Sequence, residues 1–190
     1  MRAIRHLSVL AALFVPLANA EGLYQVEMIL IRQNAEPALY HAPAPEDWRA
    51  GATALAADAE RPARLSDTLQ RLQANGDYSV LLHKAWEQTL SDEPSRVALS
   101  AGEQAYGRSP IEGTLSLTEG RFIAAQARFW VNQLDGNGSV LRSEQFKQSN
   151  SNMKRGQLNF LDGGHLALLI KVTPAGMRKL PEPDPELMEQ

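Results

Sequence analysis

The sequence predicts an α+β domain, with a strand–helix–strand first half followed by an antiparallel meander in one sheet. In the second half, apolar and polar residues alternate over several short segments joined by tight-turn signals, as in half-buried strands. In the first half, leucines at helical spacing stand between two strand-like segments. These two features together indicate the fold class.

The first half begins with a strand predicted over residues 23–32, which turns apolar on both faces toward its end, as expected for a covered central strand. Residues 34–63 are rich in Ala and Pro and are expected to form a long loop with one short helix. A helix is predicted over residues 66–74, with Ser66 as its N-cap. A second strand is predicted over residues 78–88.

The second half is expected to follow a further loop over residues 89–110. Its turn signals are Glu119-Gly120 and the stronger hairpin signal Asp-Gly-Asn-Gly at residues 135–138. The predicted strands span residues 111–118, 123–131, 140–148, 158–161 and 166–172. Because the connections are short, strands that follow each other in sequence are expected to pair antiparallel.

The two ends of the chain are expected to lie apart from this domain. Residues 1–20 combine a basic start, an apolar run and an Ala-x-Ala site, which predicts a signal peptide cleaved after Ala20. The apolar run is too short to span a bilayer, so the protein is expected in the Gram-negative periplasm and not within a membrane. Residues 21–175 are expected to form a single domain, and the acidic, Pro-rich residues 176–190 a disordered tail.

Charge is distributed unevenly along the chain. Residues 21–119 carry 15 acidic and 8 basic residues, whereas residues 120–180 carry 9 basic and 3 acidic residues. A basic half indicates an anionic partner, such as peptidoglycan stem carboxylates, acidic lipid headgroups or an acidic protein face. The alternative is that the two halves neutralise each other across the fold. Nucleic acid is not an expected partner, given export and the modest basic excess.

Sequence motifs of enzymes and metal sites are absent. The chain has no Cys, which excludes thiol catalysis and thiolate metal sites. His41, His83 and His165 stand far apart, and there is no HExxH, G-x-S-x-G or phosphate-binding glycine loop. We therefore expect no cofactor, no metal and no catalytic activity. A glycosidase-like carboxylate pair stays open as an alternative, among Glu27, Glu112, Glu144 and Asp162.

The polar face of the predicted strand 123–131 is the strongest candidate site. Gln126, Arg128 and Trp130 stand at a spacing of two, so their side chains share one face of the sheet. An indole can stack on a sugar ring, and a guanidinium and an amide can bond carboxylates and acetamido groups. The neighbouring strand is expected to add hydroxyl side chains to this face: Thr114, Ser116 and Thr118. The alternative is that a helix covers this face and that Trp130 belongs to the core.

Other aromatic residues are weaker candidates. Tyr78 and Trp86 share one face of the second predicted strand with aliphatic residues, which is more typical of core. Trp48 stands in the long loop, where it is either a lid or an anchor that holds the loop on the sheet. His83 is expected to be a hydrogen-bonded histidine on the sheet face.

Four segments match the motifs of one protein family. The first is residues 24–29, Tyr-Gln-Val-Glu-Met-Ile, and the third covers residues 113–122. The second segment matches at six positions: Tyr78, Val80, Leu81, His83, Trp86 and Gln88. The fourth segment, residues 154–164, matches at a basic pair and three later positions: Lys154, Arg155, Leu158, Leu161 and Asp162. On these segments the chain resembles the CsiV-like peptidoglycan-binding proteins over about residues 24–174.

The resemblance implies a non-catalytic protein that binds peptidoglycan and supports its synthesis. It further implies a partner, an outer-membrane lipoprotein that activates a bifunctional penicillin-binding protein. It adds candidate ligand-binding residues: Tyr78, His83, Trp86, Lys154, Arg155 and Asp162. The fourth segment lacks the Glu, both His, the Tyr hydroxyl and the Pro of the family pattern, so a divergent member is expected. The alternatives are an envelope adaptor that binds a protein and not the wall, and a hydrolase that acts on the wall.

Overall fold

The computed structural model describes residues 21–176. The predicted signal peptide (residues 1–20) and all but the first residue of the predicted tail (residues 176–190) lie outside the described residues. The strands are β1 (Gly22–Gln33), β2 (Thr53–Ala54), β3 (Tyr78–Leu90), β4 (Ser95–Ala101), β5 (Ile111–Glu119), β6 (Ile123–Leu134), β7 (Val140–Met153), β8 (Leu158–Asp162) and β9 (Leu166–Gly176). The helices are the 3-10 helix η1 (Ala57–Ala59) and the α-helix α1 (Ser66–Ala74). Within the described residues, neither helix has the length and apolarity that crossing a membrane requires.

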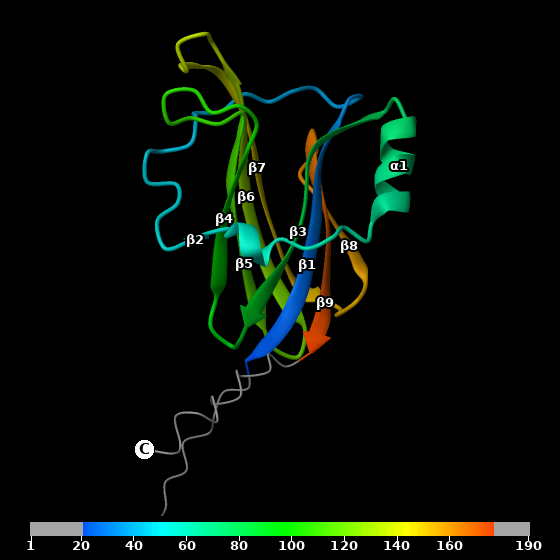
Figure 1. The fold of residues 1–190 in the computed structure, drawn as a ribbon. Coiled ribbons are helices and arrows are strands. Elements are labelled where there is room, and N and C mark those ends of the chain that lie inside the picture. Colours follow the sequence, from blue (N-terminus) through cyan, green and yellow to red (C-terminus); the bar gives the residue numbers. More distant parts are fainter. Residues whose placement is uncertain (1–20, 177–190) are drawn as a thin grey trace, which may run out of the picture.

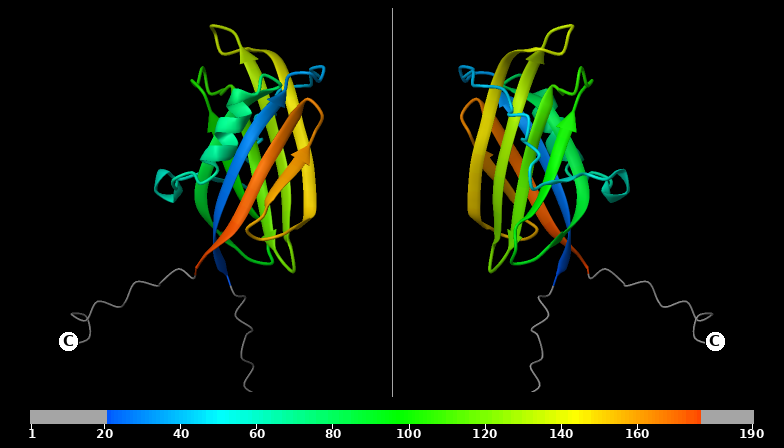
Figure 2. Two further views of the ribbon diagram at one scale, coloured as in Figure 1. Left: turned by 90° about the vertical axis from the view of Figure 1, so that its right-hand side faces the viewer. Right: turned by 90° about the vertical axis from the view of Figure 1, so that its left-hand side faces the viewer.

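The strands form two sheets that pack face to face (Figure 1, Figure 2). One sheet has the strand order β3-β1-β9-β8, and the other has the order β2-β4-β5-β6-β7. Neighbouring strands pair antiparallel, apart from the short β2, which pairs with β4 in parallel. The predicted α+β class, with a strand–helix–strand first half and an antiparallel meander, is confirmed.

The expectation that one sheet holds all the strands is corrected by this arrangement. The meander from β4 to β7 forms the five-stranded sheet together with β2, and the chain then crosses at residues 154–157 to the other sheet. There β8 pairs with β9, and β9 pairs with β1. The physical reason is that each sheet has an apolar inner face, and the two inner faces bury each other.

The loop predicted over residues 89–110 contains a strand that the sequence pattern did not indicate. Strand β4 follows β3 after a short connection, lies in the other sheet and pairs along its whole length with β5. Its three central residues, Val97, Ala98 and Leu99, are all buried. A continuous apolar run of three residues lacks the alternation that identifies a half-buried strand, which is why the pattern missed it.

The main core lies between the inner faces of the two sheets. Its largest fully buried side chains include Trp86 of β3, Phe129 of β6 and Phe146 of β7. Gly113 of β5 stands opposite Phe129, and a Cβ added to it would lie 2.2 Å from Cδ1 of that ring. Only glycine therefore allows the Phe129 ring to lie against β5.

A second apolar cluster lies on the outer face of the four-stranded sheet, beneath α1 (Figure 1). Ile29 and Ile31 of β1 pack there with Leu65, which confirms that β1 is covered on both faces. The helix has the predicted bounds, but its N-cap is Leu65, without a side-chain bond, in place of Ser66. The carboxylate of Glu27 instead accepts hydrogen bonds from the backbone N–H groups of Arg64 and Leu65, so β1 itself fixes the chain where it enters the helix.

We predict that Gly113→Ala lowers the free energy of unfolding by about 1–3 kcal/mol, as expected when a methyl group is forced into a packed core. The added Cβ meets the Phe129 ring and the backbone oxygen of Arg128, which the sheet holds in place. Gly136→Ala is the matched control, because a Cβ there meets no heavy atom within 4 Å. Urea unfolding measures the difference, and equal stability of the two variants would contradict this packing.

Candidate functional site

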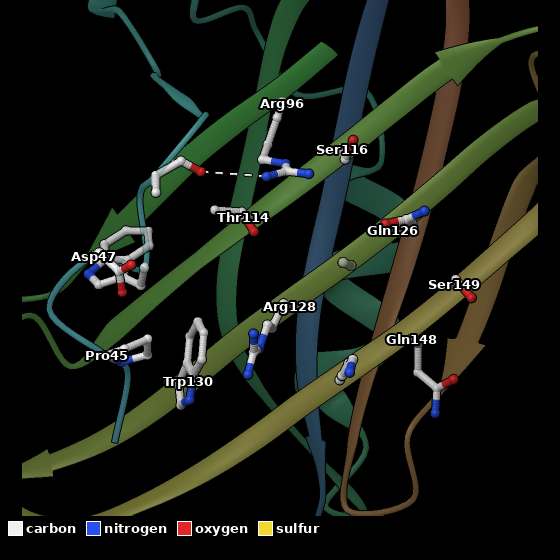
Figure 3. A pocket seen from close by; sticks show the side chains of 14 residues that line it. Pro45, Asp47, Arg96, Thr114, Ser116, Gln126, Arg128, Trp130, Gln148 and Ser149 are labelled. Carbon is white, nitrogen blue, oxygen red and sulfur yellow. Dashed lines mark hydrogen bonds between the residues drawn. The ribbon is translucent and has the colours of Figure 1, made fainter. Parts of the chain in front are cut away.

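The outer face of the five-stranded sheet carries the predicted trio. Gln126, Arg128 and Trp130 of β6 lie on this face and point into the same open space (Figure 3). The sheet register places Thr114 opposite Arg128 and Ser116 opposite Gln126, so the hydroxyl groups of β5 join them. Helix α1 packs on the other sheet, and no helix covers this face within residues 21–176.

One segment of the long loop, which we call the crossing segment (residues 41–53), runs over this face. At its start, the His41 N–H bonds the Ser143 oxygen of β7 at 2.7 Å, beside a β-bridge between Tyr40 and Glu144. At its end, Thr53 pairs with Val97 of β4. The two ends are therefore attached to opposite edges of one sheet. A long connection with both ends fixed in this way forms a wall above the strands.

The crossing segment is also held along its length. The Arg108 guanidinium donates to the Ala44 oxygen at 2.8 Å, and Ala44 itself is buried. Further along, the Arg96 guanidinium of β4 lies 3.5 Å from the Ala50 oxygen. These contacts hold the segment above the sheet and leave a space beneath it.

The space between the crossing segment and the sheet is a groove of about 560 Å³. Its wall comes from the crossing segment, with Pro45, Asp47 and Trp48, and its floor comes from β4, β5, β6 and β7 (Figure 3). Trp48 is half-buried at this wall, and the guanidinium of Arg49 lies 4.7 Å from the centre of its ring. Trp48 thus presents part of its indole to the groove.

The floor of the groove is basic. Arg96, Arg128 and Lys147 line it, and all three are exposed. None of them has a carboxylate at ion-pair distance within residues 21–176, although Asp47 lies in the groove wall. An exposed cation without a carboxylate partner is available to an anionic ligand.

Comparison with known families matches the model of the peptidoglycan-binding protein CsiV to residues 50–175. The chain belongs to the CsiV family. No curated protein and no solved structure matches it. The family match includes the four strands that form the floor of the groove, and it begins within the crossing segment.

In this CsiV-family protein, Trp130 is not exposed in the way that stacking on a sugar ring requires. Its side chain is only 2% exposed, and the guanidinium of Arg128 lies 4.6 Å from the centre of its ring. The groove that Trp130 lines is walled by the crossing segment, which contributes Pro45 to it, and not by the helix considered from the sequence (Figure 3). Trp130 therefore supports Arg128, and Trp48 is the groove indole with exposed surface.

The candidates on β3 lie away from the groove. Trp86 is 0% exposed in the core, where its indole N–H donates to Gln88 at 3.0 Å, so it offers no surface to a ligand. Tyr78 packs in the cluster beneath α1. The Nε2 atom of His83 lies 2.8 Å from the carboxylate of Glu27, on the outer face of the other sheet. Of the three, only His83 forms the sheet-face hydrogen bond expected of it.

The candidates of the fourth family segment are not brought together with the groove either. Lys154 is exposed in the turn between the two sheets. Arg155 donates to the Tyr24 hydroxyl at 3.0 Å and to Glu119 at 3.2 Å. Asp162 ends β8 and accepts hydrogen bonds from Gln33 at 3.0 Å and from the Gly164 N–H at 2.9 Å. Each of these contacts fixes a turn or an end of the sandwich.

Sequence reasoning missed two of the three cations of the groove floor. Arg96 lies on β4, which was expected to be loop, and Lys147 lies on a strand that was predicted without its register. The signal for Lys147 was available, because a hairpin at residues 135–138 places it opposite Arg128 once the strands are paired. No pattern in the sequence indicated Arg96.

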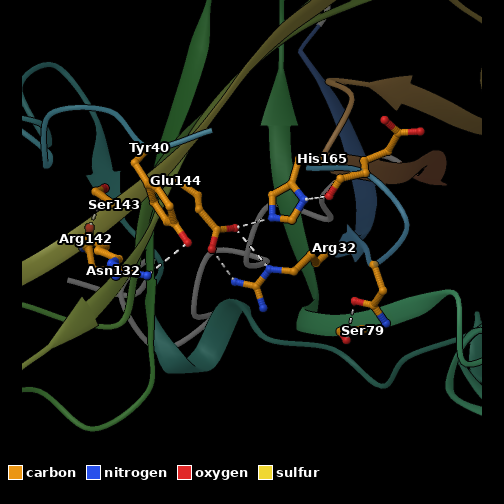
Figure 4. Close-up of polar contacts among 10 residues, drawn as sticks. Arg32, Tyr40, Ser79, Asn132, Arg142, Ser143, Glu144 and His165 are labelled. Atoms are coloured by element: carbon orange, nitrogen blue, oxygen red, sulfur yellow. Dashed lines mark hydrogen bonds and ion pairs between the residues drawn. The ribbon is translucent and has the colours of Figure 1, made fainter. Parts of the chain in front are cut away.

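The acids considered for a carboxylate pair are engaged in structural contacts. Glu112 is fully buried and accepts hydrogen bonds from the Ser109 N–H and from Asn132. Glu144 accepts two hydrogen bonds from Arg32, at 2.8 and 3.1 Å, and lies 2.9 Å from His165 Nε2 (Figure 4). Among the described residues, no three potential metal-binding side chains gather in one place.

Tyr24 forms a hydrogen-bonded group with Glu119 and Arg155. Its surroundings shift the pKa of its phenol. Burial raises the pKa of the Tyr24 phenol above its ordinary value of 10.0, and the hydrogen bond with Glu119 raises that pKa further. The hydrogen bond with Arg155 acts in the opposite direction. The neutral phenol is therefore favoured in the folded protein, and its stabilising effect is complete below pH 10.

We predict that wild-type protein is more stable than a Tyr24→Phe variant by about 1 kcal/mol below pH 10, the usual contribution of one hydrogen bond. The advantage should shrink as the pH rises from 10 through the raised pKa, because the unfolded chain releases its phenolic proton first. Tyr106→Phe, at a tyrosine that is exposed, is the control. Urea unfolding at several pH values tests this, and an advantage that grows above pH 10 would overturn it.

Proposed function

We propose that this protein is a periplasmic, non-catalytic accessory protein of cell-wall synthesis that binds peptidoglycan in the groove beneath the crossing segment. The observation that carries the proposal is the groove floor, where three cations without carboxylate partners lie beside amide and hydroxyl side chains. Membership of a peptidoglycan-binding family supports the same conclusion.

The chemistry of the groove suits a glycopeptide. Peptidoglycan offers sugar hydroxyl and acetamido groups together with peptide carboxylates, and Gln126, Thr114 and Ser116 can bond the first two kinds. Guanidinium and ammonium groups form the stronger, charge-assisted bonds with carboxylates. The volume of about 560 Å³ lies within the range of roughly 300–1,000 Å³ that is usual for ligand sites.

The predicted signal peptide supports export to the periplasm, where this ligand is found. The resemblance to CsiV-like proteins suggests a lipoprotein of the outer membrane as a partner, one that activates a bifunctional penicillin-binding protein. Exposed apolar side chains away from the groove, Leu39, Tyr40 and Leu141, offer this partner a separate surface. Wall binding and partner binding would then occur on one molecule at the same time.

We predict that residues 21–190 co-sediment with purified sacculi and that Gln126→Trp reduces this binding at least ~10-fold, equivalent to about 1.4 kcal/mol. Gln126 is exposed on the groove floor, so an indole there fills the space that a ligand would occupy. Gln133→Trp is the matched control, because Gln133 is exposed on the same strand but does not line the groove. Sedimentation at increasing protein concentration gives the two affinities.

Two results would count against this proposal. If wild-type protein does not sediment with sacculi, wall binding is rejected. If Gln126→Trp and Gln133→Trp sediment equally well, the wall is bound at another surface.

We predict that long incubation of sacculi with the protein releases no soluble muropeptides above the level of buffer alone. The four acids that were candidates for hydrolysis are held in hydrogen bonds that stabilise the fold, as described for Glu112 and Glu144. Chromatography of the supernatant is the measurement. Release of muropeptides that increases with protein concentration would replace the accessory role with a hydrolase.

A further inference from the structure

Two cations of the groove floor stand directly opposite each other. The register of β6 and β7 pairs Arg128 with Lys147, and both side chains are exposed on the outer face. Side chains in such a pair have Cβ atoms roughly 4.5–5.5 Å apart, and like charges placed so are destabilising. The sheet therefore holds two positive charges side by side at a cost to its own stability.

Nothing described around this pair neutralises it. Among residues 21–176, no carboxylate lies within ion-pair distance of Arg128 or Lys147. The partner of Arg128 on the other neighbouring strand is Thr114, which is uncharged. The Trp130 ring contacts the guanidinium of Arg128 and limits the directions in which it can turn away from Lys147. An anion bound between the two cations would remove the repulsion.

We propose that Arg128 and Lys147 bind a free carboxylate of the peptidoglycan stem peptide. This inference rests on the proposed function and names the part of the polymer that the groove recognises. The Arg128 guanidinium can donate two parallel hydrogen bonds to a carboxylate, and Lys147 adds a compact positive charge. Uncharged donors flank the pair, because the next pair on the same face of the sheet is Gln126 and Ser149. The protein would therefore bind glycan strands that carry peptides and not glycan from which peptides have been removed.

Arg96 places a further positive charge on the groove floor, besides the pair of Arg128 and Lys147. It lies on β4, two strands from Arg128, in the row that contains Ser116 and Gln126. Adjacent strands are about 4.8 Å apart, so the strands of Arg96 and Arg128 are separated by about 10 Å. An extended peptide covers that distance in about three residues. A stem peptide with two carboxylates at this separation could contact both points, whereas a single small anion could not.

The test uses residues 21–190 and three soluble probes: a disaccharide tetrapeptide, the same molecule with its carboxylates converted to carboxamides, and the disaccharide alone. We expect the acid form to bind and the other two to bind at least ~10-fold more weakly, since charge-assisted hydrogen bonds are worth about 1.5–3 kcal/mol. The R128Q/K147Q variant should lose the same factor toward the acid form and almost nothing toward the carboxamide. Isothermal titration calorimetry measures all of these affinities.

Matched variants separate this pair from general charge effects. The R71Q/R121Q variant removes two exposed cations outside the groove and should bind like the wild type. Without ligand, R128Q/K147Q should unfold at a urea concentration no lower than that of the wild type, because the substitution removes repulsion. A large loss of stability would show that the two cations serve the fold, which would overturn the inference.

The outcomes distinguish this inference from the proposed function. If Gln126→Trp abolishes sacculus binding while acid and carboxamide probes bind equally well, the groove binds the wall but not through a carboxylate. If the acid form does not bind at all, the inference fails whatever the sacculi show. If inorganic phosphate at equal concentration displaces the acid form completely, the pair is a general anion site and the inference is again rejected.

Discussion

Burial of two apolar sheet faces against each other is the interaction on which the rest of this structure depends. Trp86, Phe129 and Phe146 fill the space between the sheets, and Gly113 leaves room for the Phe129 ring against β5. The two sheets bury their inner faces in the same way, but their outer faces differ in polarity. The four-stranded sheet is aliphatic outside and needs α1 to cover it, whereas the five-stranded sheet is polar outside and can stay open to a ligand.

The charged side chains of the protein lie in two different settings, the ends of the sandwich and the groove. Near the ends of β1, charged side chains form hydrogen-bonded groups that close the sandwich: Arg32, Glu144 and His165 at one end, and Tyr24, Glu119 and Arg155 at the other (Figure 4). The Arg155–Glu119 pair joins a cation of the basic half to an acid of the acidic half, whereas in the Arg32–Glu144 pair the acidic half supplies the cation. The cations of the groove do not take part in that linkage. Charge that serves the fold and charge available to a ligand are therefore separate in space.

Much of the fold, but less of the candidate site, could be predicted from the sequence. Alternation along β6 was enough to place Gln126 and Arg128 on one face, because a period of two is a local property of a strand. The aliphatic neighbours of Trp86 on its strand face already indicated core, but the near-burial of Trp130 could not be predicted, since it depends on what covers the outer face of the five-stranded sheet. Arg96 could be placed in the groove floor only once β4 and its pairing with β5 were known, and these are properties of the whole fold.

The crossing segment has a consequence beyond the groove. The edges of a sheet present unpaired backbone groups, and two copies of a protein can join there into a continuous sheet. Bonds from residues 40–41 occupy part of the edge at β7, and β2 covers part of the edge at β4. The stretch of chain that forms the wall of the groove thus also covers part of both edges of the five-stranded sheet. It therefore hinders a second copy of the protein from pairing there. Shortening it to open the groove would therefore risk filament formation as well as altered recognition.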